Sequence, residues 1–493
     1  MNKAVLLVFA VYILWLFVNE TRRREGVSWS VWAVVVWVTM LGSRSVSTWF
    51  DYGGDATVAQ GYDEGSPLER TVYFALILYL LVVLMRRGVR WGEVMASNTW
   101  LLAFFFYWGL SVLWADAPFI SMKRWIKDVG NLVMVLAILT EARPLEAMKA
   151  VFVRAACLLL PLSVLFIRFF PDLGRTYHVW TGEMMFTGIT THKNSLGALA
   201  LVSLMFLVWD YSSRSAHSKT AHSTLRLMWD FLSPAYQLIT VRAIAPVGRA
   251  RGTWFSRLGE LSLIVMALWL LLKSASATAI GCFVIGAVLF TALSWQALRM
   301  RVRWIEFVVA IAALTVWASG KTQALVNFFV VDVFGRDPTL TTRTDVWPML
   351  IAKVEHPLFG AGFNGFWTGE RLAETYAQLQ IIQAHNGYLE TYLNGGWIAL
   401  ALLGMVLLSA LRHANRQLTH GGELASLAFA LIAVIAANNL TEASFNKTSP
   451  LWFAFLMVVV RYPPRPAASL AERDGREPKR VSAVPFNQRE MPY

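Results

Sequence analysis

The chain has 493 residues, of which 56% are hydrophobic and only 15% are charged, and its formal net charge is +13. Soluble domains carry about a quarter charged residues, so this composition excludes an ordinary soluble protein. The positive charge does not indicate a nucleic-acid partner, because the lysines and arginines cluster beside apolar runs, where loops of membrane proteins carry them.

Apolar runs recur as far as residue 461, and most are long enough to cross about 30 Å of hydrocarbon as a helix. The runs are continuous rather than alternating in polarity, which favours helices over a closed barrel. We therefore expect an all-α fold, a polytopic membrane protein with about 12–13 transmembrane helices. The expected spans are 3–19, 28–42, 68–85, 98–114, 126–140, 147–169, 194–210, 258–273, 277–298, 304–319, 396–411, 423–440 and 449–461.

Basic residues follow the odd-numbered spans, which sets the expected orientation. By the positive-inside rule, the N-terminus is expected outside and the C-terminus in the cytoplasm. Residues 1–461 then form one membrane domain with a basic cytoplasmic loop at 211–257. The Pro-rich, basic tail 462–493 is expected to be disordered and cytoplasmic.

The orientation was derived from loop charges and not from motifs. It nevertheless places most of the candidate catalytic and binding residues on the outer face. The outer segments are 114–125, 170–194, 273–278, 320–394 and 441–449. We expect the longest of them, extended to 320–395, to be a catalytic loop that lies over the helices.

Two arginines in this loop are candidate anion ligands. A guanidinium group binds phosphate or carboxylate oxygens through paired hydrogen bonds, and Arg336 precedes Arg343 by seven residues, so the pair could hold a pyrophosphate. A structural ion pair with a neighbouring aspartate and contact with lipid headgroups are the alternatives. Trp347 follows, and its ring could stack on a sugar or lie at the membrane interface.

The same loop contains His385, followed by the turn dipeptide Asn386-Gly387. An imidazole is partly neutral near physiological pH, so His385 could act as a general base on a hydroxyl group. A histidine that caps a turn is the alternative. The turn and the apolar span after it place His385 at the membrane boundary.

Further polar residues on the outer face are candidate substrate contacts. His192, Lys193 and Asn194 open a span, where a lysine and helix N-terminal amides favour an anion; a lysine that snorkels to the interface is the alternative. Lys123 and Arg124 are basic residues on the outer face, against the general trend, and bind either a substrate anion or lipid.

The sequence has no metal or redox motif that fits its context. The two cysteines, Cys157 and Cys282, lie inside apolar runs and are expected to be core residues. No HExxH motif or paired-cysteine zinc spacing occurs, so we expect no catalytic metal and no cofactor. The glycines of 360–365 match a dinucleotide fingerprint but lack its βαβ context.

Taken together, these motifs resemble the bacterial O-antigen ligase and polysaccharide polymerase superfamily (Wzy/WaaL type), and look closest to exopolysaccharide polymerases of the ExoQ type. The resemblance covers roughly residues 100 to 460. It depends on Trp114-Ala115 with Lys123-Arg124-Trp125, on His192-Lys193-Asn194 with Leu196-Gly197, on Ser274-x-Ser276-x-Thr278, on Gly335-Arg336-Asp337 with Leu340 to Asp345 and Trp347, and on Ala384-His385-Asn386-Gly387-Tyr388-Leu389.

The resemblance implies a GT-C-like membrane glycosyltransferase in the bacterial inner membrane, with its active site facing the periplasm. The implied reaction joins a glycan carried on undecaprenyl pyrophosphate to a hydroxyl group of an acceptor glycan. The essential arginine and histidine of the family correspond to Arg343 and His385. Membrane lipids, a chain-length regulator and export machinery are the implied partners.

Four functions remain open at this stage. A polymerase of lipid-linked repeat units and a ligase that transfers O-antigen to lipid A–core share both key residues. A transporter or flippase of lipid-linked glycans is the alternative outside this class, but transporters place ionisable residues near mid-membrane and show internal repeats. A sensor or assembly protein without chemistry is a further alternative.

Overall fold

The computed structural model describes most of the chain. The described residues are 2–24, 26–49, 67–177, 182–217, 250–293, 295–302, 343–379 and 381–463. Outside them lie the predicted span 304–319, the part of the outer loop that includes Arg336, most of the predicted basic loop and the tail from residue 464. For Arg343 only the backbone is described.

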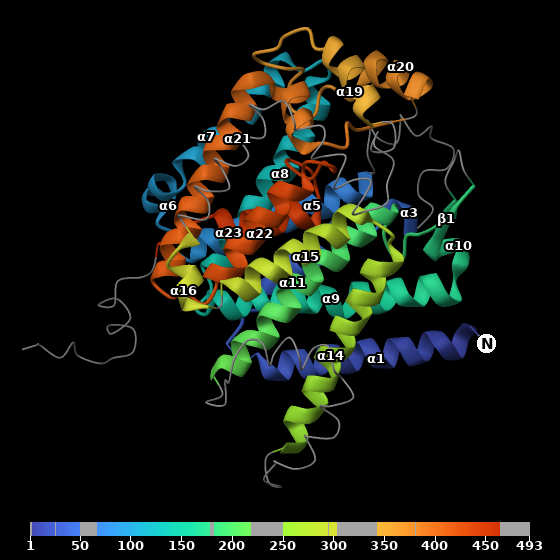
Figure 1. The fold of residues 1–493 in the computed structure, drawn as a ribbon, viewed down its shortest axis with the longest axis vertical. Coiled ribbons are helices and arrows are strands. Elements are labelled where there is room, and N and C mark those ends of the chain that lie inside the picture. The colour runs from blue at the N-terminus through green and yellow to red at the C-terminus, as the bar shows by residue number, and fades with distance from the viewer. Residues whose placement is uncertain are drawn as a thin grey trace, which may run out of the picture.

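The described residues form an almost wholly helical fold, as the composition predicts (Figure 1). The helices are α1 (Asn2–Arg23), α2 (Ser30–Leu41), α3 (Val46–Trp49), α5 (Pro67–Arg86), α6 (Trp91–Ser97), α7 (Thr99–Ser111), the 3-10 turn η1 (Val112–Trp114), α8 (Pro118–Leu139), α9 (Pro144–Phe169), α10 (Pro171–Gly174), α11 (Lys193–His217), α14 (Ala250–Lys273), α15 (Ala277–Ala292), α16 (Gln296–Arg299), α19 (Arg343–Ala352), α20 (Gly369–Leu379), α21 (Gly387–Thr419), α22 (Ala425–Asn438) and α23 (Pro450–Val459). One antiparallel hairpin joins β1 (Arg175–Tyr177) to β2 (Met184–Phe186), with Arg175 opposite Phe186.

Within the described residues, five helices are long and apolar enough to cross a membrane, namely α1, α5, α9, α11 and α21. The helices α6 and α7 form a sixth candidate span, bent by 93° between them. Every predicted span except 304–319, which is not described, coincides with a helix. The prediction of an all-α, polytopic membrane protein is therefore confirmed.

The helices α22 and α23 are short, with 14 and 10 residues. They are also deeply buried, and every residue of α23 is buried. A helix that is apolar on all sides is stable only where other elements surround it, and α8, α11 and α22 pack around α23. These two helices therefore form the centre of the bundle instead of a lipid-facing wall.

Charged contacts join the helix ends that the charge pattern assigns to one side. Arg24, after α1, is buried and bonds to Glu146 of α9 at 2.7 Å and to Asp210 of α11 at 2.5 Å. Lys149 of α9 bonds to Glu423, before α22, at 2.6 Å. The ends expected in the cytoplasm therefore meet at one end of the bundle, which we call the basic end.

At the opposite end, the described part of the predicted outer loop folds into a small helical layer of its own, which we call the lid (residues 343–395). Its core contains Leu350, Phe366, Trp367 and Leu393, which are each at most 1% exposed. Figure 1 shows α19 and α20 above the start of α21. The lid is thus packed on its own apolar side chains, which gives the residues on it fixed positions.

The predicted span 396–411 begins earlier than expected, because α21 starts at Gly387 and bends at Gly396. Gly396 has φ 63°, and a Cβ there would lie 2.3 Å from the backbone of Leu358. Only glycine fits both this conformation and this close approach. The bend lets the lid pack against the span and separates the first turns of α21, which belong to the lid, from its membrane part.

Candidate active site

The start of α21 is fixed by Asn386. Its Oδ1 accepts hydrogen bonds from the backbone N–H groups of Tyr388 and Leu389, both at 3.0 Å, and its Nδ2 donates to the carbonyl of Leu440 at 3.2 Å. Asparagine is among the best N-cap residues for this reason. Asn386, predicted as a substrate contact, thus uses its side chain to hold the helix start and to join it to the segment after α22.

Gly387 lies where two loops approach each other closely. Its N–H donates to the carbonyls of Asn439 at 2.8 Å and Glu442 at 3.0 Å, and a Cβ on it would lie only 2.0 Å from Asn439 Oδ1. The same Oδ1 accepts from the N–H groups of Ser444 and Phe445. Asn439 therefore shapes the turn that carries Glu442, and Gly387 allows this turn to reach the start of α21.

We expect Gly387→Ala to lower the free energy of unfolding by about 1–3 kcal/mol, the usual cost of overpacking a buried site. The matched control is Gly404→Ala in the same helix, since a Cβ at Gly404 meets no atom within 4 Å. Thermal unfolding of the full chain in detergent checks both variants. An equal effect of the two substitutions would contradict the close contact at Gly387.

Glu442 joins two predicted site residues from distant parts of the chain. Its Oε1 accepts a hydrogen bond from Nδ2 of Asn194, at the start of α11, at 2.7 Å. Its Oε2 lies 3.3 Å from Nδ1 of His385. The carboxylate is largely buried, with 15% of the side chain exposed. Glu442 thereby brings α11, the lid and the end of α22 together at one point.

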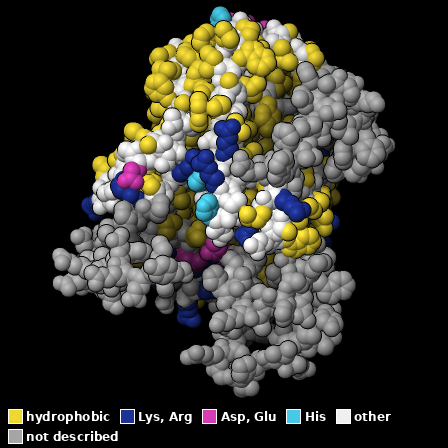
Figure 2. Space-filling model, turned by 60° about the vertical axis from the view of Figure 1, so that its left-hand side comes forward, with side chains coloured by type: hydrophobic (Ala, Val, Ile, Leu, Met, Phe, Trp, Pro, Cys, Tyr) yellow, Lys and Arg dark blue, Asp and Glu magenta, His cyan; other side chains and the backbone are white. Residues whose placement is uncertain are grey.

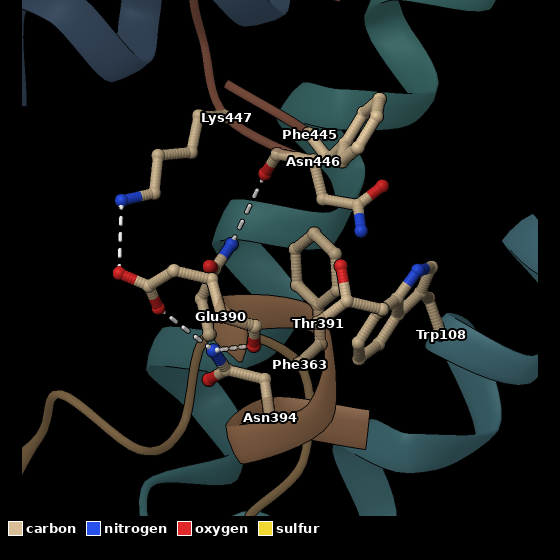
Figure 3. Close-up of a pocket in the computed structure, with 9 residues that line it drawn as sticks. Trp108, Phe363, Glu390, Thr391, Asn394, Phe445, Asn446 and Lys447 are labelled. Carbon is tan, nitrogen blue, oxygen red and sulfur yellow. Dashed lines mark hydrogen bonds and ion pairs between the residues drawn. The ribbon is translucent and has the colours of Figure 1, made fainter. Parts of the chain in front are cut away.

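The same ring nitrogen of His385 also contacts a second chain of polar side chains. Gln383 Nε2 lies 3.3 Å from His385 Nδ1, and Lys447 Nζ donates to Gln383 Oε1 at 3.0 Å. Lys447 also reaches Glu390 at 3.3 Å, and Figure 3 shows this contact beside Asn394, which hydrogen-bonds to the same carboxylate. We call Asn194, Gln383, His385, Glu442 and Lys447 the His385 cluster.

Trp347 ties α19 to this cluster. Its indole N–H donates to the carbonyl of Ala384 at 2.9 Å, while the N–H of Ala384 donates to Glu390 at 2.9 Å. The carbonyl and the N–H of Ala384, the residue before His385, are thus both held by side chains. Arg343 is the first residue of α19 and lies four positions before Trp347, and residues four apart lie on one face of a helix. Arg343 therefore lies one helical turn before the residue whose indole contacts the chain next to His385.

His385 itself has a left-handed backbone conformation, with φ 51°. This region costs free energy for a residue other than glycine, and such residues concentrate at functional sites, where the surrounding contacts enforce them. In this site the hydrogen bonds to the backbone of Ala384 and the helix cap at Asn386 hold His385 in this conformation. The sequence alternative of a histidine that caps a turn does not describe this site, because Asn386 provides the cap.

The contacts of the imidazole favour one tautomer. Nδ1 lies 3.3 Å from the Glu442 carboxylate and from the Gln383 amide. A carboxylate can only accept, and hydrogen bonds to a charged group are the stronger ones. We therefore expect the proton on Nδ1, directed at Glu442, which leaves the lone pair of Nε2 to accept a proton from another molecule.

The other predicted site residues lie at the same end of the bundle but play different parts in the structure. Arg124 donates to the carbonyl of Asn364 in the lid at 2.7 Å, and Lys123 lies 4.9 Å above the ring of Phe119. Lys193 begins α11 and is half-buried. His192 Nδ1 accepts from the N–H of Asn194 at 3.2 Å.

Glu442 and Lys447 were not among the residues selected from the sequence. Both lie in the segment 441–449, which the charge pattern places on the outer face, and they are its only acidic and only basic residue. The signal available in the sequence was that each is the single residue of its charge in a short loop between two apolar spans. It did not identify His385 as the partner of Glu442, since 57 residues separate them.

These features define a polytopic helical membrane protein with a histidine–carboxylate pair that joins a folded lid to the segment after α22. Residues 261–404 match the family model described as O-antigen ligase. Over 357 residues the chain is 27% identical to the "Exopolysaccharide production protein ExoQ" of Rhizobium meliloti (strain 1021), an alignment that covers 69% of each chain. The chain is thus similar to O-antigen ligases and to an exopolysaccharide production protein, which agrees with the resemblance that its motifs predict. The family match includes Arg343, Trp347 and His385 and ends before Glu442.

Proposed function

We propose that this protein is a membrane glycosyltransferase that polymerises oligosaccharide repeat units carried on undecaprenyl pyrophosphate into an exopolysaccharide or O-antigen. The superfamily supports glycosyl transfer from lipid-linked glycans, and the relative named for exopolysaccharide production supports a polymer as the product. We place the active site at the lid end, which the positive-inside rule assigns to the periplasmic face of the inner membrane.

In the proposed reaction, an acceptor hydroxyl attacks the anomeric carbon of the donor glycan. Nε2 of His385 takes the hydroxyl proton as the new glycosidic bond forms. The bond from the anomeric carbon to the pyrophosphate oxygen breaks, and its electron pair leaves with undecaprenyl pyrophosphate. Arg343 stabilises the charge that develops on this leaving group. A direct displacement of this kind inverts the anomeric centre and needs no metal.

The observation that carries this proposal is the contact of Glu442 with His385, because it gives the histidine the carboxylate partner that orients a general base. The link from Trp347 to Ala384 supports Arg343 as the anion ligand, since it brings the start of α19 toward the same site. Lys193, Arg336 and the pair Lys123–Arg124 are proposed as further contacts of the pyrophosphate.

A ligase that transfers O-antigen to lipid A–core is the second candidate, because the family model that matches residues 261–404 is described as O-antigen ligase. The proposed chemistry is the same, and only the acceptor differs. A polymerase uses a second lipid-linked glycan as acceptor, whereas a ligase uses lipid A–core.

A deletion strain that expresses wild type, Arg343→Ala or His385→Ala separates these functions when its glycans are sized on a gel. We expect wild type to restore long polymer, and the variants to leave single repeat units on the lipid carrier. Polymer that forms in the deletion strain but stays off lipid A–core would instead identify a ligase. Full rescue by both variants, at normal expression, would overturn the proposed active site.

We propose Glu442 as a positioning residue that acts through His385. We expect Glu442→Gln to lower kcat by about 10- to 100-fold with little change in KM, because a misdirected imidazole is a poorly placed base. In a His385→Gln background the same substitution should change kcat no further. Assay of the four proteins with lipid-linked repeat units checks both statements.

The matched control is Glu355→Gln, which removes an exposed lid carboxylate paired with Arg371 at 3.2 Å. Exposed ion pairs contribute little, so this variant should keep wild-type kcat. If Glu442→Gln lowered activity as much without His385 as with it, Glu442 would not act through the imidazole.

A further inference from the structure

A polar pocket lies at the basic end of the bundle, and the His385 cluster lies at the opposite end. It lies between α7 and α21 and encloses about 450 Å³, part of it open to the surroundings. Its wall combines apolar side chains, among them Trp100, Met405 and Leu408, with basic ones from the last turns of α21 and from the segment after α23. Figure 2 shows arginine, lysine and histidine side chains gathered below a broad apolar surface.

Three arginines line this pocket, and none of them forms an ion pair with a carboxylate that the structure describes. Arg412 and Arg416 are exposed, lie one turn apart on α21, and make no ion pair or side-chain hydrogen bond with any residue that the structure describes. Three cations without a carboxylate between them repel one another. A site of this kind is therefore built for an anion that arrives from outside the chain.

The third arginine is fixed in place. Arg461 donates to the carbonyl and the hydroxyl group of Ser409 at 2.6 and 2.9 Å. Its backbone N–H is held by Asn98 at 2.8 Å, at the point where α6 turns away from α7. The guanidinium is thus a rigid anchor.

The position of the pocket indicates what kind of anion it takes. The predicted span 98–114 begins where α6 turns by 93° away from α7, so a membrane around this span would have its lipid headgroups at the level of the pocket. Trp100 and Leu408 are 43% and 40% exposed and face outward beside the arginines. An amphiphile that carries a phosphate beside acyl chains matches this combination of charged and apolar walls.

We propose that this pocket binds the phosphate of an anionic phospholipid from the leaflet at the basic end. The site is separate from the proposed active site, which lies at the other end of the same helix. Two-pronged guanidinium–phosphate contacts from Arg412 and Arg416 hold the headgroup, Arg461 closes the pocket, and the acyl chains lie along α7 and α21.

The test uses the full chain in zwitterionic phosphatidylcholine bicelles, with phosphatidylglycerol added in steps and thermal unfolding as the readout. We expect phosphatidylglycerol to raise the Tm of wild type. In Arg412→Gln/Arg416→Gln its apparent affinity should fall about 100-fold, since each guanidinium–phosphate contact that is lost contributes about a factor of ten. The double variant Arg299→Gln/Arg301→Gln removes the same charge outside the pocket and should respond like wild type.

Two outcomes would overturn the proposal. Equal responses of the two double variants would mean that phosphatidylglycerol acts on the net charge of the surface. A rise in Tm with inorganic phosphate or glycerol 3-phosphate as large as that with phosphatidylglycerol would assign the pocket to a soluble phosphate compound. If the pocket variant unfolded early without lipid, binding of phosphatidylglycerol measured by native mass spectrometry at low temperature would still separate it from the control.

Discussion

Replacing His385 by glutamine is expected to lower kcat by about 10²- to 10⁴-fold, the range that a general base contributes. Glutamine keeps a polar side chain of similar length in the cluster but cannot accept a proton from a hydroxyl group at neutral pH. Substrate binding should change little, because the effect of a base is confined to the transition state. Single-turnover assays with purified protein and lipid-linked repeat units measure this loss.

The matched control for this variant is His356→Gln, which changes an exposed histidine of the same lid. It should retain wild-type kcat. A His385→Gln protein that is folded and still turns over at the wild-type rate would remove His385 from the mechanism, and with it the positioning role of Glu442.

Replacing Arg343 by alanine is expected to lower kcat by about 10²- to 10³-fold, comparable with the loss of one donor to a developing negative charge. Arg343→Lys should recover only part of the activity, since an ammonium group supplies the charge but not the planar pair of donors. The rates of the three proteins should thus rank Arg343, then lysine, then alanine at this position.

Lys353→Gln serves as the control, since it removes a positive charge just after α19, where Lys353 pairs with Glu374 at 2.9 Å on the surface. It should leave kcat unchanged. If Arg343→Lys were as active as wild type, the guanidinium would not bind pyrophosphate oxygens in pairs. If Arg343→Ala were also active, the leaving group would be stabilised elsewhere.

The sequence predicted the helical frame well, because each span is a run of apolar residues of helix length and requires no knowledge of its neighbours. The run 147–169, for example, became α9, at Pro144–Phe169. The same local signal also located the ends of the bundle, since basic residues beside the spans meet at one end. The short apolar runs at 423–440 and 449–461 show the limit of this signal, because it does not distinguish a central helix from a lipid-facing one.

The candidate site was predicted only in part. His385 and Asn194 were selected separately, each for its own chemistry, and the structure joins them through Glu442, which was not selected. Asn386 was selected as a substrate contact, but its side chain holds the helix start. Local sequence shows what a side chain can do, whereas its partners depend on which loops the fold brings together.

The sequence alone thus determined that the protein is a helical, polytopic membrane protein and where most of its helices lie, because hydrophobic length acts locally along the chain. The tertiary structure decided the pairing of Glu442 with His385, the contact of Trp347 with Ala384 and the pocket between α7 and α21. These contacts join residues tens to hundreds of positions apart. They exist because the helices pack and return to a common end, which no local pattern specifies.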